Sequence, residues 1–256
     1  MEISIVLVIL GLLTGGVLAG QSLIKAAELR SQITQIEEYE LAVNVFKDKY
    51  LGTPGDLINA ESFWPAQTNN GDGDGMIEAA TGFSGTYTSA DNQHFDGERP
   101  HFFRQLSLAS LVKDAFDGSQ ILGSGYPKTA INPSAGIFIA GPWQLHLWSP
   151  VSGNTLYDNI SDIATSRMYL YLGVCNPAMV GAVGGSVSGH NDLCGTLTSE
   201  EMYQIETKID DAIPKSGKIL AQSWNAFPVC SINAGQDYNL LESSARTCNM
   251  LYKLSD

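Results

Sequence analysis

The stretch that decides the fold is residues 2–24, EISIVLVILGLLTGGVLAGQSLI. Between Glu2 and Lys25 it holds no charged side chain. About twenty apolar residues at a rise of about 1.5 Å each cover the roughly 30 Å hydrocarbon core of a bilayer. A cleavable secretory signal needs a basic region ahead of its apolar stretch, whereas the only ionisable side chain here is acidic. We therefore predict one membrane-spanning helix rather than a cleaved signal.

The same helix is expected to continue well past the apolar run. From Leu29 to Tyr50, apolar residues recur at steps of three, four or seven and charged residues fill the other positions, which is typical of an amphipathic helix. No proline or glycine interrupts residues 21–51, and Gly52, Pro54 and Gly55 then end the pattern. We predict one rod over residues 1–51, about 75 Å long. Its half 1–24 is hydrophobic, and its half 25–51 packs against a globular domain at 52–256.

Composition limits the function classes. The 256 residues carry 14 Lys and Arg against 27 Asp and Glu, a net charge of -13. Such a chain repels phosphate backbones at long range, which excludes general nucleic-acid binding. Hydrophobic residues make up 44% and charged residues 16%, so the chain can bury a core and is not disordered throughout.

Beyond residue 55 the pattern is that of a mixed domain without internal repeats or a linker. Two short helices are expected at 56–64 and 100–116, and Thr198 with Glu201 fits a capping box that opens a third helix ending before Pro214. Alternating, β-branched or aromatic stretches predict strands at 136–140, 143–148, 167–174, 218–223 and 247–254. We expect an α+β fold in which an antiparallel sheet lies across the long helix.

The N-terminal stretch resembles the signature of the type IV pilins and of the pseudopilins of type II secretion, in which a single glutamate opens an otherwise uncharged helix. Residues 208–218, KIDDAIPKSGK, are also similar to larger pilin-like proteins. The resemblance implies a pilin-like fold and a structural subunit that polymerises through its hydrophobic helix into an extracellular filament. It also implies N-terminal cleavage and methylation, with no residue assigned to either. The family's basic leader is absent here, where Met1 directly precedes Glu2.

The partners that this resemblance implies are further copies of the chain in a helical homopolymer, the pilus or secretion assembly machinery, and the inner membrane, crossed once before assembly. Two alternatives stay open. One is a secretion pseudopilin that builds a short periplasmic piston. The other is a membrane-anchored, calcium-dependent adhesin that acts as a single binding module.

Five residues are predicted to serve assembly. A carboxylate at the tip of an apolar helix costs roughly 2.5 kcal/mol or more to bury alone, so Glu2 needs a partner. The resemblance implies the N-terminal amine of a neighbouring subunit; the alternative is a solvated glutamate at the positive end of the helix. Gly11, Gly15, Gly16 and Gly20 each cost roughly 1 kcal/mol relative to alanine in a helix. They either allow close helix packing or, as the resemblance implies, let the helix unwind at Gly15 and Gly16 during assembly.

Residues 70–77, NGDGDGMI, place oxygen-bearing side chains at alternate positions with glycines between them. This is the pattern of the first half of an EF-hand loop and predicts a calcium site. The predicted ligands are Asn70, Asp72 and Asp74 through their side chains, Met76 through its carbonyl, and Glu78, which compensates for the missing glutamate at the twelfth position. A turn without an ion is the alternative. A second polar cluster, His94, Asp96, Glu98 and His101, follows no metal template and is expected to be a solvated loop.

Four cysteines fall in the last third of the chain, and their spacing lacks the CxxC pattern of zinc sites. Four cysteines allow three pairings. Export past the inner membrane would favour disulfides, and nearest-neighbour pairing closes two loops of about twenty residues, each worth roughly 3 kcal/mol. We favour Cys175 with Cys194, and Cys230 with Cys248, the second of which would fix the final strand.

Enzymatic motifs are missing from the sequence. It contains no GxSxG elbow, no HExxH and no Walker loop. Asp210 and Asp211 are adjacent, so on a helix they would point about 100° apart and make a poor acid and base pair. We do not expect an enzyme.

Overall fold

The structure is a computed structural model that describes residues 2–75, 77, 98–119, 121–140, 168–174, 195–223, 230–232, 236–242 and 245–255. Its helices and strands follow one another in a mixed order. They are α1 (Glu2–Tyr50), α2 (Ala60–Phe63), α3 (Glu98–Leu108), β1 (Gly136–Ala140), β2 (Tyr169–Val174), β3 (Leu197–Thr198), α5 (Ser199–Ile209), β4 (Ile219–Ser223), β5 (Ser231–Ile232), β6 (Asp237–Tyr238), the 3-10 helix η2 (Leu240–Glu242) and β7 (Arg246–Lys253).

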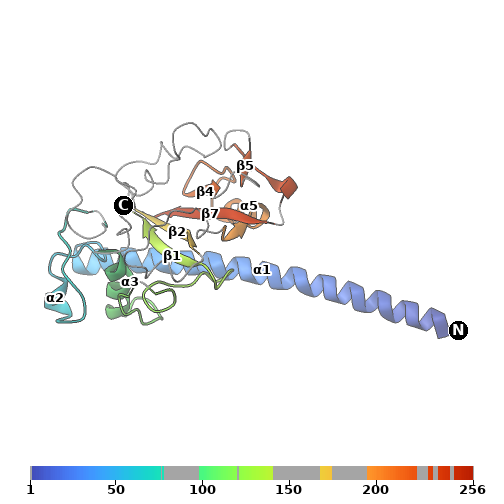
Figure 1. Ribbon diagram of the computed structural model, residues 1–256, viewed down its shortest axis with the longest axis horizontal. Helices are drawn as coiled ribbons and strands as arrows, with labels where there is room; N and C mark the ends of the chain where they lie inside the picture. The colour runs from blue at the N-terminus through green and yellow to red at the C-terminus, as the bar shows by residue number, and fades with distance from the viewer. Residues whose placement is uncertain are drawn as a thin grey trace, which may run out of the picture.

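The long helix is confirmed as a single element. α1 runs without a break for 49 residues, and its N-terminal half extends far beyond the rest of the molecule (Figure 1). It ends at Tyr50 because Leu51 adopts a left-handed φ of 56° and Pro54, which lacks an amide hydrogen, follows shortly after. Of the rod predicted over residues 1–51, the structure therefore contains Glu2 to Tyr50 as one helix.

The second half of α1 is packed against the domain through one apolar face. The buried side chains on that face are Leu29, Ile33, Ile36, Tyr39, Ala42, Val43 and Phe46. Polar side chains beside them bind the domain: Gln35 donates to the carbonyl of Lys128 at 2.8 Å, and the Gln32 amide oxygen accepts from the backbone N–H of Ile131 at 3.2 Å. Apolar burial and these hydrogen bonds together fix the domain on the helix.

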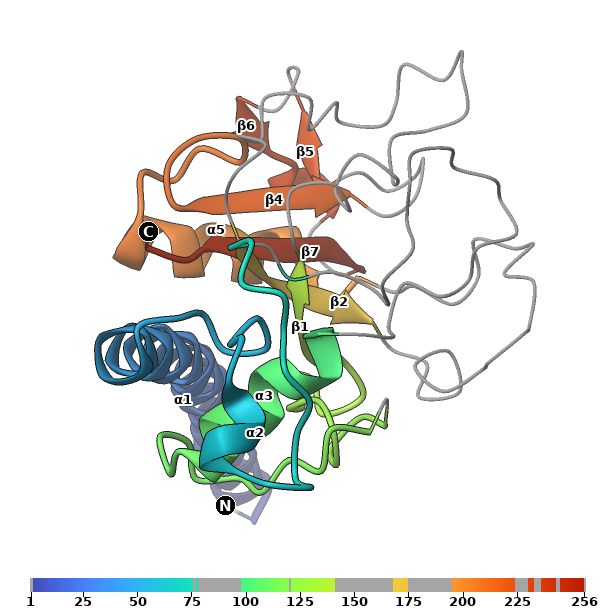
Figure 2. The same cartoon turned by 90° about the vertical axis from the view of Figure 1, so that its left-hand side faces the viewer.

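An antiparallel sheet forms the centre of the domain. β7 pairs with β2 through residues 250–253 and with β4 through residues 248–252, so these two strands lie on opposite edges of β7. β1 extends the sheet beyond β2, and β3 pairs with the start of β7. In Figure 2, the sheet and α5 lie above α1, and α2 and α3 lie beside it. The expected α+β layout, a long helix with a small antiparallel sheet, is therefore present.

Several expected boundaries shift for identifiable reasons. α2 covers 60–63 instead of 56–64, because the chain from Thr53 to Ala60 forms turns closed by short-range backbone hydrogen bonds. α3 ends at Leu108 instead of residue 116. There Ser110 takes a left-handed φ of 58°, and the N–H groups of Ser110 and Leu111 bond to the carbonyls of Ser107 and Leu106, which is a Schellman motif. The expected strand at 143–148 lies outside the described residues.

The capping box that opens α5 is confirmed. The Thr198 hydroxyl accepts from the N–H of Glu201 at 3.1 Å, and the N–H of Thr198 donates to the Glu201 carboxylate at 2.9 Å. Glu201 also forms ion pairs with Arg246 of β7 and with Lys25 of α1. Lys25, the first charged residue after the apolar run, therefore lies where α1 meets the domain.

Candidate functional site: a bare apolar helix and an acidic loop

The apolar half of α1, residues 3–24, is not covered by any other part of the chain that the structure describes. Every side chain from residue 3 to residue 19, and again from 21 to 24, is exposed. Among the described residues, α1 is the one helix long and apolar enough to cross a membrane. The large apolar side chains left exposed on it are Ile3, Ile5, Val6, Leu7, Val8, Ile9, Leu10, Leu12, Leu13, Val17, Leu18, Leu23 and Ile24.

The four glycines of this half are not required by the subunit's own fold. α1 stays helical through all of them, and a Cβ added at any of the four would meet nothing within 4 Å. At about 100° per residue, the pair Gly11 and Gly15 and the pair Gly16 and Gly20 centre on directions about 140° apart around the helix. The glycines thus form two separate small-residue patches that are open to neighbours.

Glu2 occupies the first position of α1. The placement of its side chain lies outside what the structure describes, so its contact with a neighbouring amine stays a prediction. Inside the apolar run, the hydroxyl of Thr14 donates to the carbonyls of Leu10 and Gly11 at 2.9 and 3.1 Å, within its own helix.

The acidic loop, residues 70–75, folds around a carboxylate from outside it. Asp56 accepts hydrogen bonds from the N–H groups of Gly73 at 2.6 Å and Gly75 at 2.8 Å. Both glycines have a left-handed φ, 78° and 87°, which side-chain-bearing residues rarely adopt. As a result, carboxylate oxygens of Asp56, Asp72 and Asp74 all lie within 4.8 Å of one another.

The charges of this group are only partly compensated. Burial raises the pKa of Asp56, and the charges of Asp72 and Asp74 raise it further, although the two backbone N–H groups act in the opposite direction. A fourth carboxylate, that of Glu98, accepts from the N–H of Asp72 at 3.1 Å. Calcium binds six to eight oxygen ligands at about 2.3–2.6 Å, so oxygens this close together fit a shared calcium ion. The loop is a candidate cation site.

The group of side chains that the structure brings together differs in its third member from the predicted ligands. The Asn70 side-chain oxygen accepts a hydrogen bond at 2.9 Å from the N–H of Glu61, which lies in the first turn of α2. The carboxylate beside Asp72 and Asp74 is that of Asp56. Met76 and Glu78 lie outside the described residues. Sequence spacing could not find Asp56, because it is separated from Asp72 by a helix and a turn.

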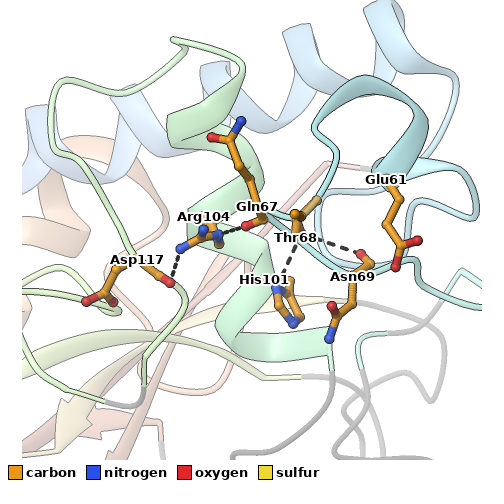
Figure 3. A pocket seen from close by; sticks show the side chains of 8 residues that line it. Glu61, Gln67, Thr68, Asn69, His101, Arg104 and Asp117 are labelled. Carbon is orange, nitrogen blue, oxygen red and sulfur yellow. Dashed lines mark hydrogen bonds between the residues drawn. The ribbon is translucent and has the colours of Figure 1, made fainter.

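A polar pocket of about 420 Å³ lies near the acidic loop, between the chain around residues 61–69 and α3 (Figure 3). Arg104 donates to the carbonyls of Gln67 and Asp117, and Thr68 lies 3.3 Å from His101 Nδ1. Burial and the Arg104 charge lower the pKa of His101, which keeps it neutral. Several polar groups of the lining, among them those of Arg104 and Thr68, are thus bonded to other residues that line the pocket.

The expectation that the second polar cluster is a solvated loop is wrong for two of its four residues. Glu98 and His101 are not in a solvated loop; both belong to α3, and His101 is partly buried against Thr68. His94 and Asp96 lie outside the described residues.

One predicted disulfide is confirmed. Cys230 and Cys248 are bonded with their Cα atoms 5.1 Å apart, and the bond joins β7 to the residue just before β5. Cys175 and Cys194 lie outside the described residues, so their pairing stays a prediction.

Two features therefore do not contribute to the fold of the described residues. They are the apolar half of α1, called here the bare half, and the acidic loop. The first exposes apolar surface to water, and the second brings like charges together. No protein-family model, no curated protein and no solved structure matches the chain.

Proposed function

We propose that the chain is a structural subunit that polymerises through residues 3–24 into a type IV pilus-like filament. The observation that supports this most is a contrast along one unbroken helix. Residues 29–46 bury a continuous apolar face in the domain, whereas residues 3–24 bury none. Exposed apolar surface costs about 25 cal/mol per Å² in water, so the bare half requires lipid or protein around it.

Lipid covers the bare half before assembly, and identical helices cover it afterwards. A helix inside a filament core contacts neighbours on more than one side. The two glycine patches, about 140° apart, allow close approach on two sides, whereas a simple helix dimer needs one. The glycine positions therefore favour an array over a pair.

The domain forms the outer surface of the proposed filament. It is bound to the second half of α1 on several sides, for example through Glu40, which accepts from the Lys218 ammonium and from the Tyr252 hydroxyl at 2.7–2.8 Å. A net charge of -13 keeps such a surface soluble but makes neighbouring subunits repel one another. Cations bound at acidic groups reduce that repulsion.

We propose calcium as the cation of the acidic loop, held by Asp56, Asp72 and Asp74. Carboxylate oxygens are the ligands that calcium prefers, and the loop carries no sulfur or imidazole ligand among its described residues. Binding would neutralise the charges around Asp56 and stabilise the domain by linkage. The acidic loop then contributes to filament stability and not to catalysis.

The test of filament formation is mechanical shearing of cells that express the chain, followed by electron microscopy and mass identification of the sheared material. The proposal expects long filaments that contain this chain. A Glu2→Gln variant, which retains the size of the side chain and loses its charge, should insert into the membrane yet give few filaments. Short periplasmic assemblies would indicate the pseudopilin alternative, and unassembled membrane-anchored chains would contradict polymerisation.

A further inference from the structure

A buried carboxyl group joins the C-terminal end of α5 to β6. Glu206 lies in the last turns of α5 and is 0% exposed. Tyr238 of β6 is 6% exposed, and its side chain shares a hydrogen bond with that of Glu206. The rings of Tyr238 and of Tyr203 on α5 also meet edge to face, with their centroids 5.8 Å apart. Glu206 and Tyr238 therefore form the polar part of the contact between α5 and β6.

Two further carboxylates lie beside Glu206. Asp210 is the C-cap of α5 and Asp211 follows it, and oxygens of all three side chains lie within 4.8 Å of one another. Asp210 accepts from two backbone N–H groups, both at 2.6 Å, and Asp211 accepts from one at 2.9 Å. Asp211 is exposed and Asp210 is half-buried, whereas Glu206 is buried. Because an ionised group is least favourable where water is excluded, a proton that binds this group belongs on Glu206.

The cations on the elements packed against α5 are engaged elsewhere. Lys218, which precedes β4, binds Glu40 of α1 at 2.7 Å. Lys25 of α1 and Arg246 of β7 both pair with Glu201, at the opposite end of α5. None of these ion pairs includes the carboxyl of Glu206 or of its two neighbours.

The charges that act most on Glu206 are negative. Burial, and after it the charges of Asp211 and Asp210, raise the pKa of Glu206 to about 8, against the opposite effect of its bond with Tyr238. The C-terminal end of α5 is itself partly negative. On the neighbouring elements, Asp237 of β6 is exposed, and η2 carries Glu242, whose side-chain placement lies outside what the structure describes. Glu206 is therefore neutral while it is packed at neutral pH.

We propose that the β6–η2 segment, residues 237–242, is a pH-sensitive switch that stays packed on α5 while Glu206 is protonated and detaches when Glu206 ionises. An ionised Glu206 would be a buried charge beside two others, and detachment admits the water that solvates it. The segment is weakly held: β5 and β6 pair through two residues each, and Leu240 and Leu241 of η2 are exposed. This switch does not depend on filament formation or on the acidic loop.

The direction of the pH effect follows from the two states of Glu206. In the detached segment its carboxyl ionises near the ordinary pKa of about 4.3. The packed state is therefore fully favoured below that pH. As pH rises further, the packed state loses about tenfold against the detached state for each unit, and the loss levels off near the pKa of about 8 in the packed state.

The test is hydrogen exchange of the full chain in detergent with chelator, followed by mass spectrometry between pH 6 and pH 9. The reporter is a peptide that covers residues 237–242. In it the N–H of Asn239 donates to the carbonyl of Cys230, a bond that detachment breaks because the disulfide holds Cys230 on β7. After correction for the intrinsic exchange rate, protection should fall about tenfold per pH unit up to about pH 8. Glu206→Gln, which cannot ionise, should keep its protection across this range.

Two further variants separate the switch from a merely structural contact. Glu200→Gln, in the first turn of the same helix, is the control and should follow the wild type. Asp211→Asn removes one like charge at an exposed position, where an amide oxygen can still accept from Ile213. Its packed state tolerates ionised Glu206 better, so protection at pH 8 should exceed that of the wild type. Equal pH responses in the wild type and in Glu206→Gln, or no gain from Asp211→Asn, would overturn the proposal.

Discussion

At the scale of single residues, Asp56 determines how the acidic loop is arranged. Its carboxylate holds the N–H groups of Gly73 and Gly75, and its own charge lies among those of Asp72 and Asp74. The repeating Asp and Gly pattern predicted a loop with cation ligands, but a carboxylate brought in from a distant position has no local sequence signal. Two of the three neighbouring carboxylates belong to the pattern, and tertiary structure supplies the third, that of Asp56.

Replacing Asp56 should remove the calcium response of the loop. At calcium ten times above its dissociation constant, binding to the folded state stabilises by about 1.4 kcal/mol, a shift of a few degrees in melting temperature. An Asp56→Asn variant should lose this shift in thermal melts recorded with chelator and with millimolar calcium. Asp48→Asn, an exposed carboxylate on α1, serves as the control and should retain it. Equal shifts in both variants would remove Asp56 from the site.

Glu40 predicts a dependence on pH. Partial burial favours its neutral form, but the Lys218 and Tyr252 hydrogen bonds outweigh burial and hold the pKa below its usual value. A lowered carboxylate pKa stabilises the folded state above the unfolded pKa, near 4.3, and this stability is lost as pH falls through the folded value. Glu40→Gln should lower the free energy of unfolding by about 1 kcal/mol at pH 7 and have little effect near pH 3.

The matched control for Glu40 lies two residues earlier on the same helix. Glu38 pairs with Lys113, and both side chains are more than half exposed. Such surface pairs contribute about 0–1 kcal/mol, so Glu38→Gln should change stability less than Glu40→Gln at pH 7. Denaturant unfolding of the full chain in detergent at the two pH values measures both. A Glu40→Gln effect that does not vary with pH would contradict the assignment.

At the scale of secondary-structure elements, prediction from sequence succeeded where the pattern was long or the local chemistry specific. The apolar run and the amphipathic repeat define α1, β1 matches its expected range, and the Thr198 and Glu201 capping box opens α5. It failed at the end of α3, because the left-handed position there is occupied by Ser110 and not by the glycine that usually marks it. Likewise, adjacency in the sequence did not predict that oxygens of Asp210 and Asp211 lie within 4.8 Å of each other, because α5 ends at Ile209 and Asp210 has extended backbone angles.

The glycine patches on α1 give an element-scale prediction for assembly. A Cβ added at Gly11 or Gly15 meets nothing within 4 Å, so with leucine at both positions the domain should fold as before. In a filament the added bulk would separate neighbouring helices, and filament yield should fall at least tenfold. Thr14→Leu puts similar bulk on the same turn, about 80° or more from both patches, and should reduce yield less. Unchanged yield from the double glycine variant, measured by shearing and electron microscopy, would exclude close packing there.

The disulfide gives a second prediction at this scale. It joins Cys230 and Cys248, at a sequence separation of 18, and fixes β7, which pairs with three other strands. By the loop-entropy model its loss costs about 3 kcal/mol. Cys230→Ser with Cys248→Ser should therefore lower the denaturant midpoint markedly, whereas an unchanged midpoint would show that the sheet holds β7 without the bond.

At the scale of the whole molecule, one helix performs two tasks. Its second half is the core element on which the sheet, α3 and α5 are packed, and its first half projects from the domain without cover (Figure 1). In the proposed filament, an unbroken helix that continues from the domain into the apolar half would give each subunit a fixed relation between its outer surface and its contacts with neighbours. That geometry suits a polymer in which helices form the core and domains form the surface.

The central claim, that residues 3–24 form the core of a polymer, is tested most directly by cryo-electron microscopy of filaments sheared from cells that express the chain. The proposal predicts a helical reconstruction with the apolar halves of α1 packed together at the centre and the domains at the outside. The two glycine patches should face neighbouring helices. A filament held together by its domains, with residues 3–24 remaining outside the core or in the membrane, would contradict the claim.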